Sequence, residues 1–135
     1  MTTPRKYIGP FSSMPVGSDA NVSVVRAVAA IGATGLLGVV APQGLYRASA
    51  FCTINVPGGG GWLQLILKAQ QEGGPVALST FALPPLLIAS TDIESGSFII
   101  SSDGSADITY EVDFTGATIG SLQYSLRIVM EQLSL

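Results

Sequence analysis

Three long stretches of the chain alternate between residues that favour burial and residues that favour water. They span residues 45–56, 61–70 and 121–133. A period of two places every second side chain on the same face of a β-strand, so these stretches predict half-buried strands. The faces that we expect to point inward carry Tyr46, Ala48, Ala50, Cys52 and Ile54, then Leu63, Leu65, Leu67 and Ala69, then Leu122, Tyr124, Leu126, Ile128 and Met130.

Shorter strand candidates lie between the second and third stretches, at 76–83, 86–90, 97–101 and 106–114. Segments rich in Gly, Pro or Ser separate these candidates, and no run has the period of a long helix. Many short strands at this spacing are typical of sandwiches. We therefore predict an all-β fold, an antiparallel β-sandwich of jelly-roll type with seven or eight strands, over residues 22–135.

The first 21 residues differ from the rest, because Pro4, Pro10 and Pro15 interrupt any helix or central strand. Single large apolar residues are spaced along this segment between the prolines. The pattern predicts an extended N-terminal arm over residues 1–21 that lies along another surface. A disordered tail is the alternative interpretation.

A turn signal stands between two of the shorter strand candidates, in the sequence SSDGSA. Asp103 and Gly104 both tolerate the positive φ values that tight β-turns require. The pair predicts a tight hairpin that joins strand 97–101 to strand 106–114.

The sequence GATGLLG, with Gly32, Gly35 and Gly38, has the spelling of a dinucleotide-binding loop. That loop needs a helix directly after it and an acidic residue about 20 positions later. Pro42 and Gly44 follow too soon for such a helix, and after Gly38 no Asp or Glu occurs until Glu72. We therefore predict that residues 31–40 form β-structure and a turn, with no helix after Gly38 and no bound nucleotide.

The composition of the chain bears on association with other chains rather than on the fold. Charged residues make up 11% of the 135 residues, against about 25% in typical soluble domains, and the mean hydropathy is +0.50. So few charges cannot cover the surface of a monomer, so we expect apolar surface that packs against other chains. The longest uncharged apolar run near the N-terminus, 27–41, contains three glycines and is too short to span a membrane.

The charge pattern also bears on partners and location. The net charge is −3 and there is no basic cluster, so we expect no nucleic-acid partner. We likewise expect no membrane partner. No apolar stretch follows the basic residues near the N-terminus, so we expect synthesis and assembly in the cytosol.

The absence of histidine removes Ser-His-Asp triads, Cys-His pairs and the usual zinc sites. Carboxylates remain as candidates, and strand periodicity puts Asp107, Glu111 and Asp113 on one face with Thr109. Asp92 and Glu94 lie in the preceding loop. Such groups are able to bind calcium or to act as a glycosidase pair, but a solvated outer face is the interpretation we favour. Its opposite row, Ile108, Tyr110 and Val112, would point inward. We expect no catalytic activity, no cofactor and no metal.

Two single residues have chemical alternatives. Cys52 lies within an apolar strand pattern, which favours a buried structural thiol over a nucleophile. Trp62 begins a strand beside a run of glycines, where its ring is able to stack on a sugar. A packing or interface role is the interpretation that we favour for Trp62.

Three segments resemble a β-sandwich found in structural proteins of tailed bacteriophages. They are GLYRASAFCTINV (44–56), DGSADITYEVDFTG (103–116) and YSLRIVMEQL (124–133). Similar modules occur as capsid decoration (cement) proteins and as tail-fibre or receptor-binding heads, usually as trimers. The resemblance covers about residues 42–135 and leaves the arm outside.

The resemblance implies a non-enzymatic virion protein, made in the host cytoplasm and located on the capsid surface. It implies a homotrimer that stabilises the phage head by bridging subunits of the major capsid protein. A tail-fibre or receptor-binding head that contacts host surface glycans is the alternative. The arm residues that we expect to contact the capsid are Arg5, Lys6, Tyr7, Ile8, Phe11 and Met14.

Overall fold

The computed structural model describes residues 21–70 and 78–134, and these contain nine strands and no helix. Residues 1–20 of the predicted arm, with all six of its candidate contact residues, lie outside the described residues, and residue 21 belongs to a strand rather than to an arm. The strands are β1 (Asn21–Ala27), β2 (Ile31–Gly35), β3 (Gly44–Val56), β4 (Gly60–Gln70), β5 (Leu78–Ala82), β6 (Leu86–Leu87), β7 (Ile93–Ser102), β8 (Thr109–Thr118) and β9 (Gln123–Ser134).

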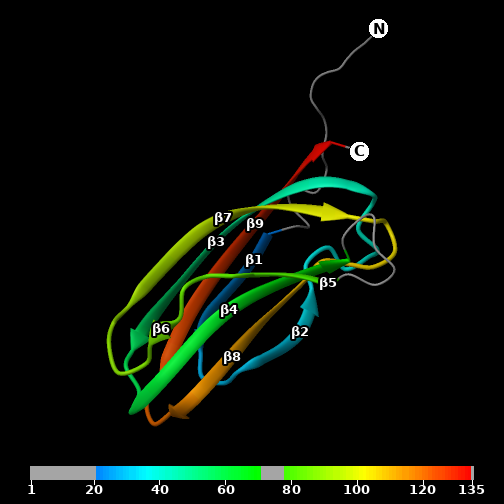
Figure 1. Ribbon diagram of the computed structural model, residues 1–135. Coiled ribbons are helices and arrows are strands. Elements are labelled where there is room, and N and C mark those ends of the chain that lie inside the picture. The colour runs from blue at the N-terminus through cyan, green and yellow to red at the C-terminus, as the bar shows by residue number, and fades with distance from the viewer. Residues whose placement is uncertain (1–20, 71–77, 135) are drawn as a thin grey trace, which may run out of the picture.

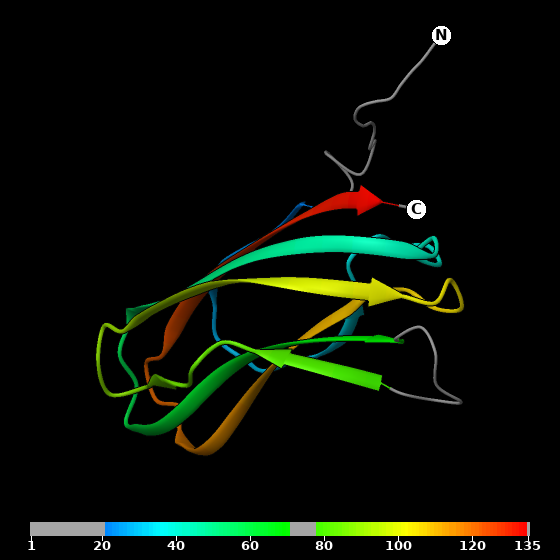
Figure 2. The same cartoon turned by 45° about the horizontal axis from the view of Figure 1, so that its top comes forward.

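The strands form two sheets that pack face to face (Figures 1 and 2). The first, sheet A, has the order β1-β9-β3-β7, and the second, sheet B, has the order β2-β8-β4-β5 with β6 also paired to β4. Every pairing is antiparallel. The predicted all-β fold and antiparallel β-sandwich are confirmed. The described residues contain nine strands rather than the seven or eight predicted, because residues 21–35 form two separate strands.

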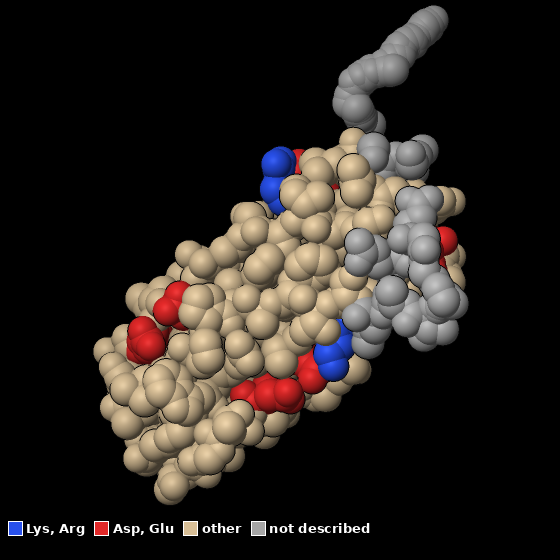
Figure 3. Space-filling model, in the orientation of Figure 1, with Lys and Arg blue, Asp and Glu red and all other residues tan. Residues whose placement is uncertain are grey.

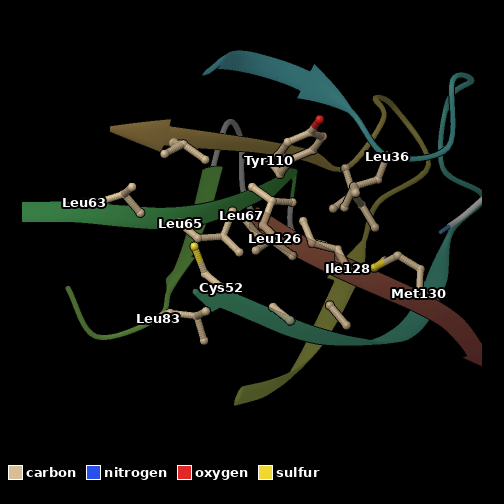
Figure 4. Close-up of a cluster of buried hydrophobic side chains, with 14 of the residues drawn as sticks. Leu36, Cys52, Leu63, Leu65, Leu67, Leu83, Tyr110, Leu126, Ile128 and Met130 are labelled. Carbon is tan, nitrogen blue, oxygen red and sulfur yellow. The ribbon is translucent and has the colours of Figure 1, made fainter. Parts of the chain in front are cut away.

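The core lies between the sheets and includes the residues that the alternation placed inward (Figure 4). All the side chains named above for the faces at 45–56, 61–70 and 121–133 are buried. The burial follows from the pleat, since one face of each strand packs on the other sheet while the second face points outward. The longest strand, β3, pairs along its length with both β7 and β9.

The predicted hairpin at Asp103 and Gly104 is wrong. β7 pairs with β3 in sheet A, whereas β8 pairs with β2 and β4 in sheet B. Residues 103–108 therefore cross from one sheet to the other. The turn chemistry itself is present, because Gly104 has a φ of 83° and Asp103 Oδ1 accepts a hydrogen bond of 2.9 Å from the Ser105 amide. A turn motif specifies a local reversal, but the neighbouring strands decide the pairing.

The GATGLLG segment forms β2 followed by a turn, and within the described residues no helix follows it, as predicted. The Asp107 carboxylate explains two of its glycines. This carboxylate accepts hydrogen bonds from the amides of Leu37, at 3.2 Å, and Gly38, at 2.9 Å. A Cβ atom on Gly35 would collide with the same carboxylate, and Gly38 has a φ of 75° that favours glycine. The glycines therefore fit a turn held by Asp107.

Candidate interaction surface

The outer face of sheet A is the most apolar exposed surface among the described strands. On three of its strands, β3, β7 and β9, the exposed fractions of the large apolar side chains run from 39% for Val129 to 58% for Ile93. The side chains come from the outward positions of three adjacent strands, β3, β7 and β9. They are Leu45, Phe51, Ile93, Ile99, Val129 and Leu133. Isolated exposed apolar residues are normal, whereas several on one face are typical of association sites.

Strand register places these side chains among small polar ones. In one row Phe51 lies between Ser95 of β7 and Arg127 of β9. In the next row Ser49 lies between Ser97 and Val129. Serine side chains are short, so they leave the apolar side chains standing above the sheet. The arrangement leaves Phe51 accessible to a partner.

Charge on this face is sparse and mostly paired. The row of Arg47 has Ile99 on one side and Glu131 on the other. The guanidinium of Arg47 contacts Glu131 Oε1 through Nη2 at 2.7 Å and through Nε at 2.8 Å. The pair cancels its own charge, which leaves Arg127 as the one other ionisable side chain on the outward positions of β3, β7 and β9. A partner would therefore have little charge to desolvate here.

The outer face of sheet B is more polar. Lys68 Nζ lies 3.2 Å from Glu111 Oε1, and Gln64 pairs in register with Asp113. Large exposed apolar side chains occur at one end, where Trp62 pairs with Leu87. Trp62 is 47% exposed, so its ring does not serve the core. Figure 3 shows that across the face in view acidic and basic residues occur in a few small groups within an uncharged surface.

The carboxylates predicted to share a face are not gathered into one site. Asp107 precedes β8 and binds the 36–38 turn, Glu111 pairs with Lys68, and Asp113 is exposed. Within the described residues, no group of three His, Cys, Asp or Glu side chains is placed to hold a metal ion. The inward row of this strand, Ile108, Tyr110 and Val112, is buried as predicted.

Asp92 also has a local structural role. Its Oδ1 atom accepts a hydrogen bond of 3.0 Å from the Ile93 amide, and its Oδ2 atom accepts one of 3.2 Å from the Leu87 amide. These contacts hold the turn that leads from β6 to β7. Glu94 pairs with Cys52 in register, at the margin of the inward face.

Buried ionisable groups lie in the core beneath both outer faces. Cys52 is fully buried, and burial raises the pKa of its thiol to about 12, which keeps it in the unreactive neutral form. Burial also raises the pKa of Tyr124, whose hydroxyl donates a hydrogen bond of 2.6 Å to the Ala29 carbonyl. Tyr46 donates one of 2.8 Å to the Pro42 carbonyl. The burial of Cys52 agrees with the predicted buried thiol.

The comparisons with known proteins found no match that would assign a role to this surface. No protein-family model matches the chain, and no curated protein matches it. In the described residues there is no helix long and apolar enough to cross a membrane.

Sequence reasoning did not find the apolar face of sheet A as a site. The signal was present in part, because the alternation at 45–56 placed Phe51 outward. The residues IESGSFIIS at 93–101 also alternate, which puts Ile93 and Ile99 on the same face of one strand. What was missing was the register that brings these residues onto one face.

Proposed function

We propose that this protein is a non-enzymatic structural protein of a phage virion, a capsid decoration protein that forms a homotrimer and bridges subunits of the major capsid protein. The observation that carries the proposal is the outer face of sheet A, with its six exposed apolar side chains and sparse charge. Apolar area removed from water contributes about 25 cal/mol per Å² to the free energy of binding. Burial of an extended sheet face is therefore able to hold two proteins together without any catalysed reaction.

We also propose that the sandwich is of jelly-roll type, and the pairing pattern supports this. β1 pairs with β9, β2 with β8, β3 with β7, and β4 with β5. This is the pattern of one long hairpin with its turn between β4 and β5. Rolling that hairpin into two sheets adds the pairs β3 with β9 and β4 with β8. Jelly rolls are common in viral capsid domains and also occur in lectins and cupins.

The proposed arm contributes a second contact in this hypothesis. Residues 1–20 precede β1, which begins at Asn21 and is an edge strand of sheet A. In the proposal these residues follow the surface of a neighbouring chain, with their basic and large apolar side chains as contacts. Deleting residues 1–20 should weaken capsid binding and leave the fold intact, which circular dichroism would check.

The copy number of the protein in purified virions tests the role. Quantitative mass spectrometry should find hundreds of copies per particle, in a fixed ratio to the major capsid protein. Tens of copies per particle would indicate a tail protein instead, and absence from virions would overturn the proposal. Light scattering of the isolated protein tests the trimer, and a stable monomer would contradict it.

A tail-fibre or receptor-binding head is the second candidate, because Trp62 is exposed beside polar side chains. It pairs with Thr115 on one side and Leu87 on the other, next to the row of Gln64 and Asp113. An exposed indole flanked by hydrogen-bonding groups is able to stack on a sugar ring. Glycan-array binding that is lost in Trp62→Ala and kept in Phe51→Ala would favour this function over decoration.

A further inference from the structure

β7 is an edge strand of unusual regularity. It ends the order of sheet A, so in the described part of the chain one of its two edges has no strand paired to it. On its other edge, all ten residues from Ile93 to Ser102 pair one to one with β3, without a register shift. A long regular edge presents unpaired backbone amides and carbonyls that template another strand.

The other three edges of the sandwich are shorter or irregular. β1 has a register shift between Val24 and Ala27, where Arg26 has a φ of 53°. β2 and β5 have five residues each, and β2 also has a register shift next to Ile31. Short strands and bulges are the devices by which proteins protect their edges. β7 has neither device.

One side chain of β7 is of a type that protects edges, an inward-pointing charge. It belongs to Glu94, which is the one ionisable residue of the strand. Ile93 and Ile99, 58% and 54% exposed, point to the outer face with Ser95 and Ser97 between them. Edge strands that avoid association usually carry lysine or proline, and β7 carries neither. The strand has the features of one that is paired in the assembled state.

We propose that the β7 strands of two copies of this chain pair antiparallel about a two-fold axis at Gly96. In that register Ile93 of each copy lies opposite Ile99 of the other, and Ser95 lies opposite Ser97. The pair joins the two sheets A into one continuous sheet. Its outer face then carries the apolar side chains of both copies side by side.

The sequence of β7 selects this register over its neighbours. An axis at Ser97 would put Ile93 opposite Ser101 and Ile99 opposite Ser95, so no isoleucine would meet another. An axis at Gly96 makes two isoleucine pairs by symmetry. It places Glu94 opposite Phe98, so the two Glu94 carboxylates do not oppose each other. A second copy therefore complements this edge without an unfavourable charge contact.

The place of this contact in a shell rests on the proposed function, but the contact itself does not. Trimers on the local three-fold axes of a capsid are related to their neighbours by two-fold axes. A two-fold contact through β7 would therefore connect one trimer to the next and close a cage. A three-fold contact through another surface and a two-fold contact through β7 are compatible.

Cross-linking of the isolated protein tests the pairing and its register. The double variant Ile93→Cys/Ile99→Cys places a cysteine opposite a cysteine twice in each pair, whereas each single variant places it opposite isoleucine. With a short bismaleimide, the double variant should give a two-chain band as its main product on a denaturing gel. Both single variants should remain one-chain bands. Cys52 is buried in the folded chain and does not compete.

Controls keep the outcome decisive. Phe51→Cys/Val129→Cys, on the same face but on inner strands, should give no two-chain band. No cross-link in the folded double variant, equal cross-linking in the single variants, or a three-chain ladder would each overturn the proposal. The far-ultraviolet circular dichroism of every variant establishes folding. Copy number in virions decides the proposed function separately, because the cross-link uses protein alone.

Discussion

The outer faces of the two sheets are both formed by half-buried antiparallel strands, but their outward side chains differ in polarity. On sheet A the outward positions hold six large apolar side chains and an exposed ion pair. On sheet B they hold Lys68, Glu111, Gln64 and Asp113, with Trp62 and Leu87 at one end. Alternation alone thus identifies a half-buried strand, while the outward residues distinguish a surface for water from a surface for a partner.

The largest effect should separate the inward side of a strand from its outward side. Leu65→Ala removes a fully buried side chain of β4 and leaves a cavity, so we expect the free energy of unfolding to fall by about 2–5 kcal/mol. Phe51→Ala removes a larger side chain from the outer face of sheet A and should change it by less than about 1 kcal/mol. Urea unfolding of both variants measures the difference. A large loss for Phe51→Ala would mean that the outer face serves the fold of one chain.

A charged substitution on each outer face tests whether the two faces differ in the proposed capsid binding. Phe51→Asp puts a carboxylate into the apolar face of sheet A, and we expect capsid binding to weaken by about 2 kcal/mol or more, roughly 30-fold. Thr115→Asp is the matched variant on sheet B, next to Trp62, and should leave capsid binding unchanged. Co-sedimentation with capsids that lack the protein gives the measurement. Equal losses for both variants would remove the distinction between the faces.

The long strands were predictable because period-two alternation directly reports burial on one side. β3, β4 and β9 were placed with the correct inward faces for this reason. The hairpin at Asp103 was not predictable, because a turn motif is local and β7 had a better partner in β3. The low fraction of charged residues predicted that the chain has an apolar surface for partners, but it did not predict where that surface lies. Only register shows that Phe51, Ile99 and Val129 belong to one face.

The segment between β2 and β3 allows a comparison of two glycines from the GATGLLG sequence. Gly35→Ala should lower the free energy of unfolding by about 1–3 kcal/mol, since the new methyl group collides with the Asp107 carboxylate that holds Leu37 and Gly38. Gly32→Ala is the control, because a Cβ there meets no atom within 4 Å. Thermal unfolding of both variants gives the contrast. Equal destabilisation would show that Asp107 is not what requires the glycine.

Alkaline pH should lower the free energy of unfolding through a buried group in the core, rather than through groups on either outer face. The thiol of Cys52 has its pKa raised from 9.0 to about 12 by burial, so its contribution to stability is complete below pH 9 and is lost as the pH rises toward 12. The expected slope is about 1.4 kcal/mol per pH unit from this group. Urea midpoints measured from pH 8 to 10 should fall less steeply in Cys52→Ala. Parallel curves for the two proteins would contradict the assignment.

The smallest effect compares the ion pairs of the two outer faces directly. Arg47 and Glu131 on sheet A have side chains 44% and 54% exposed, whereas Lys68 and Glu111 on sheet B are 31% and 15% exposed. Solvent and salt screen the more exposed pair more strongly, so Glu131→Gln should cost close to nothing and Glu111→Gln less than about 1 kcal/mol. Double-mutant cycles at low and high salt resolve such differences. If the Arg47–Glu131 pair proved the stronger in the isolated chain, sheet A would have a fold-stabilising charge contact of its own. Its surface would then be less fully explained by assembly.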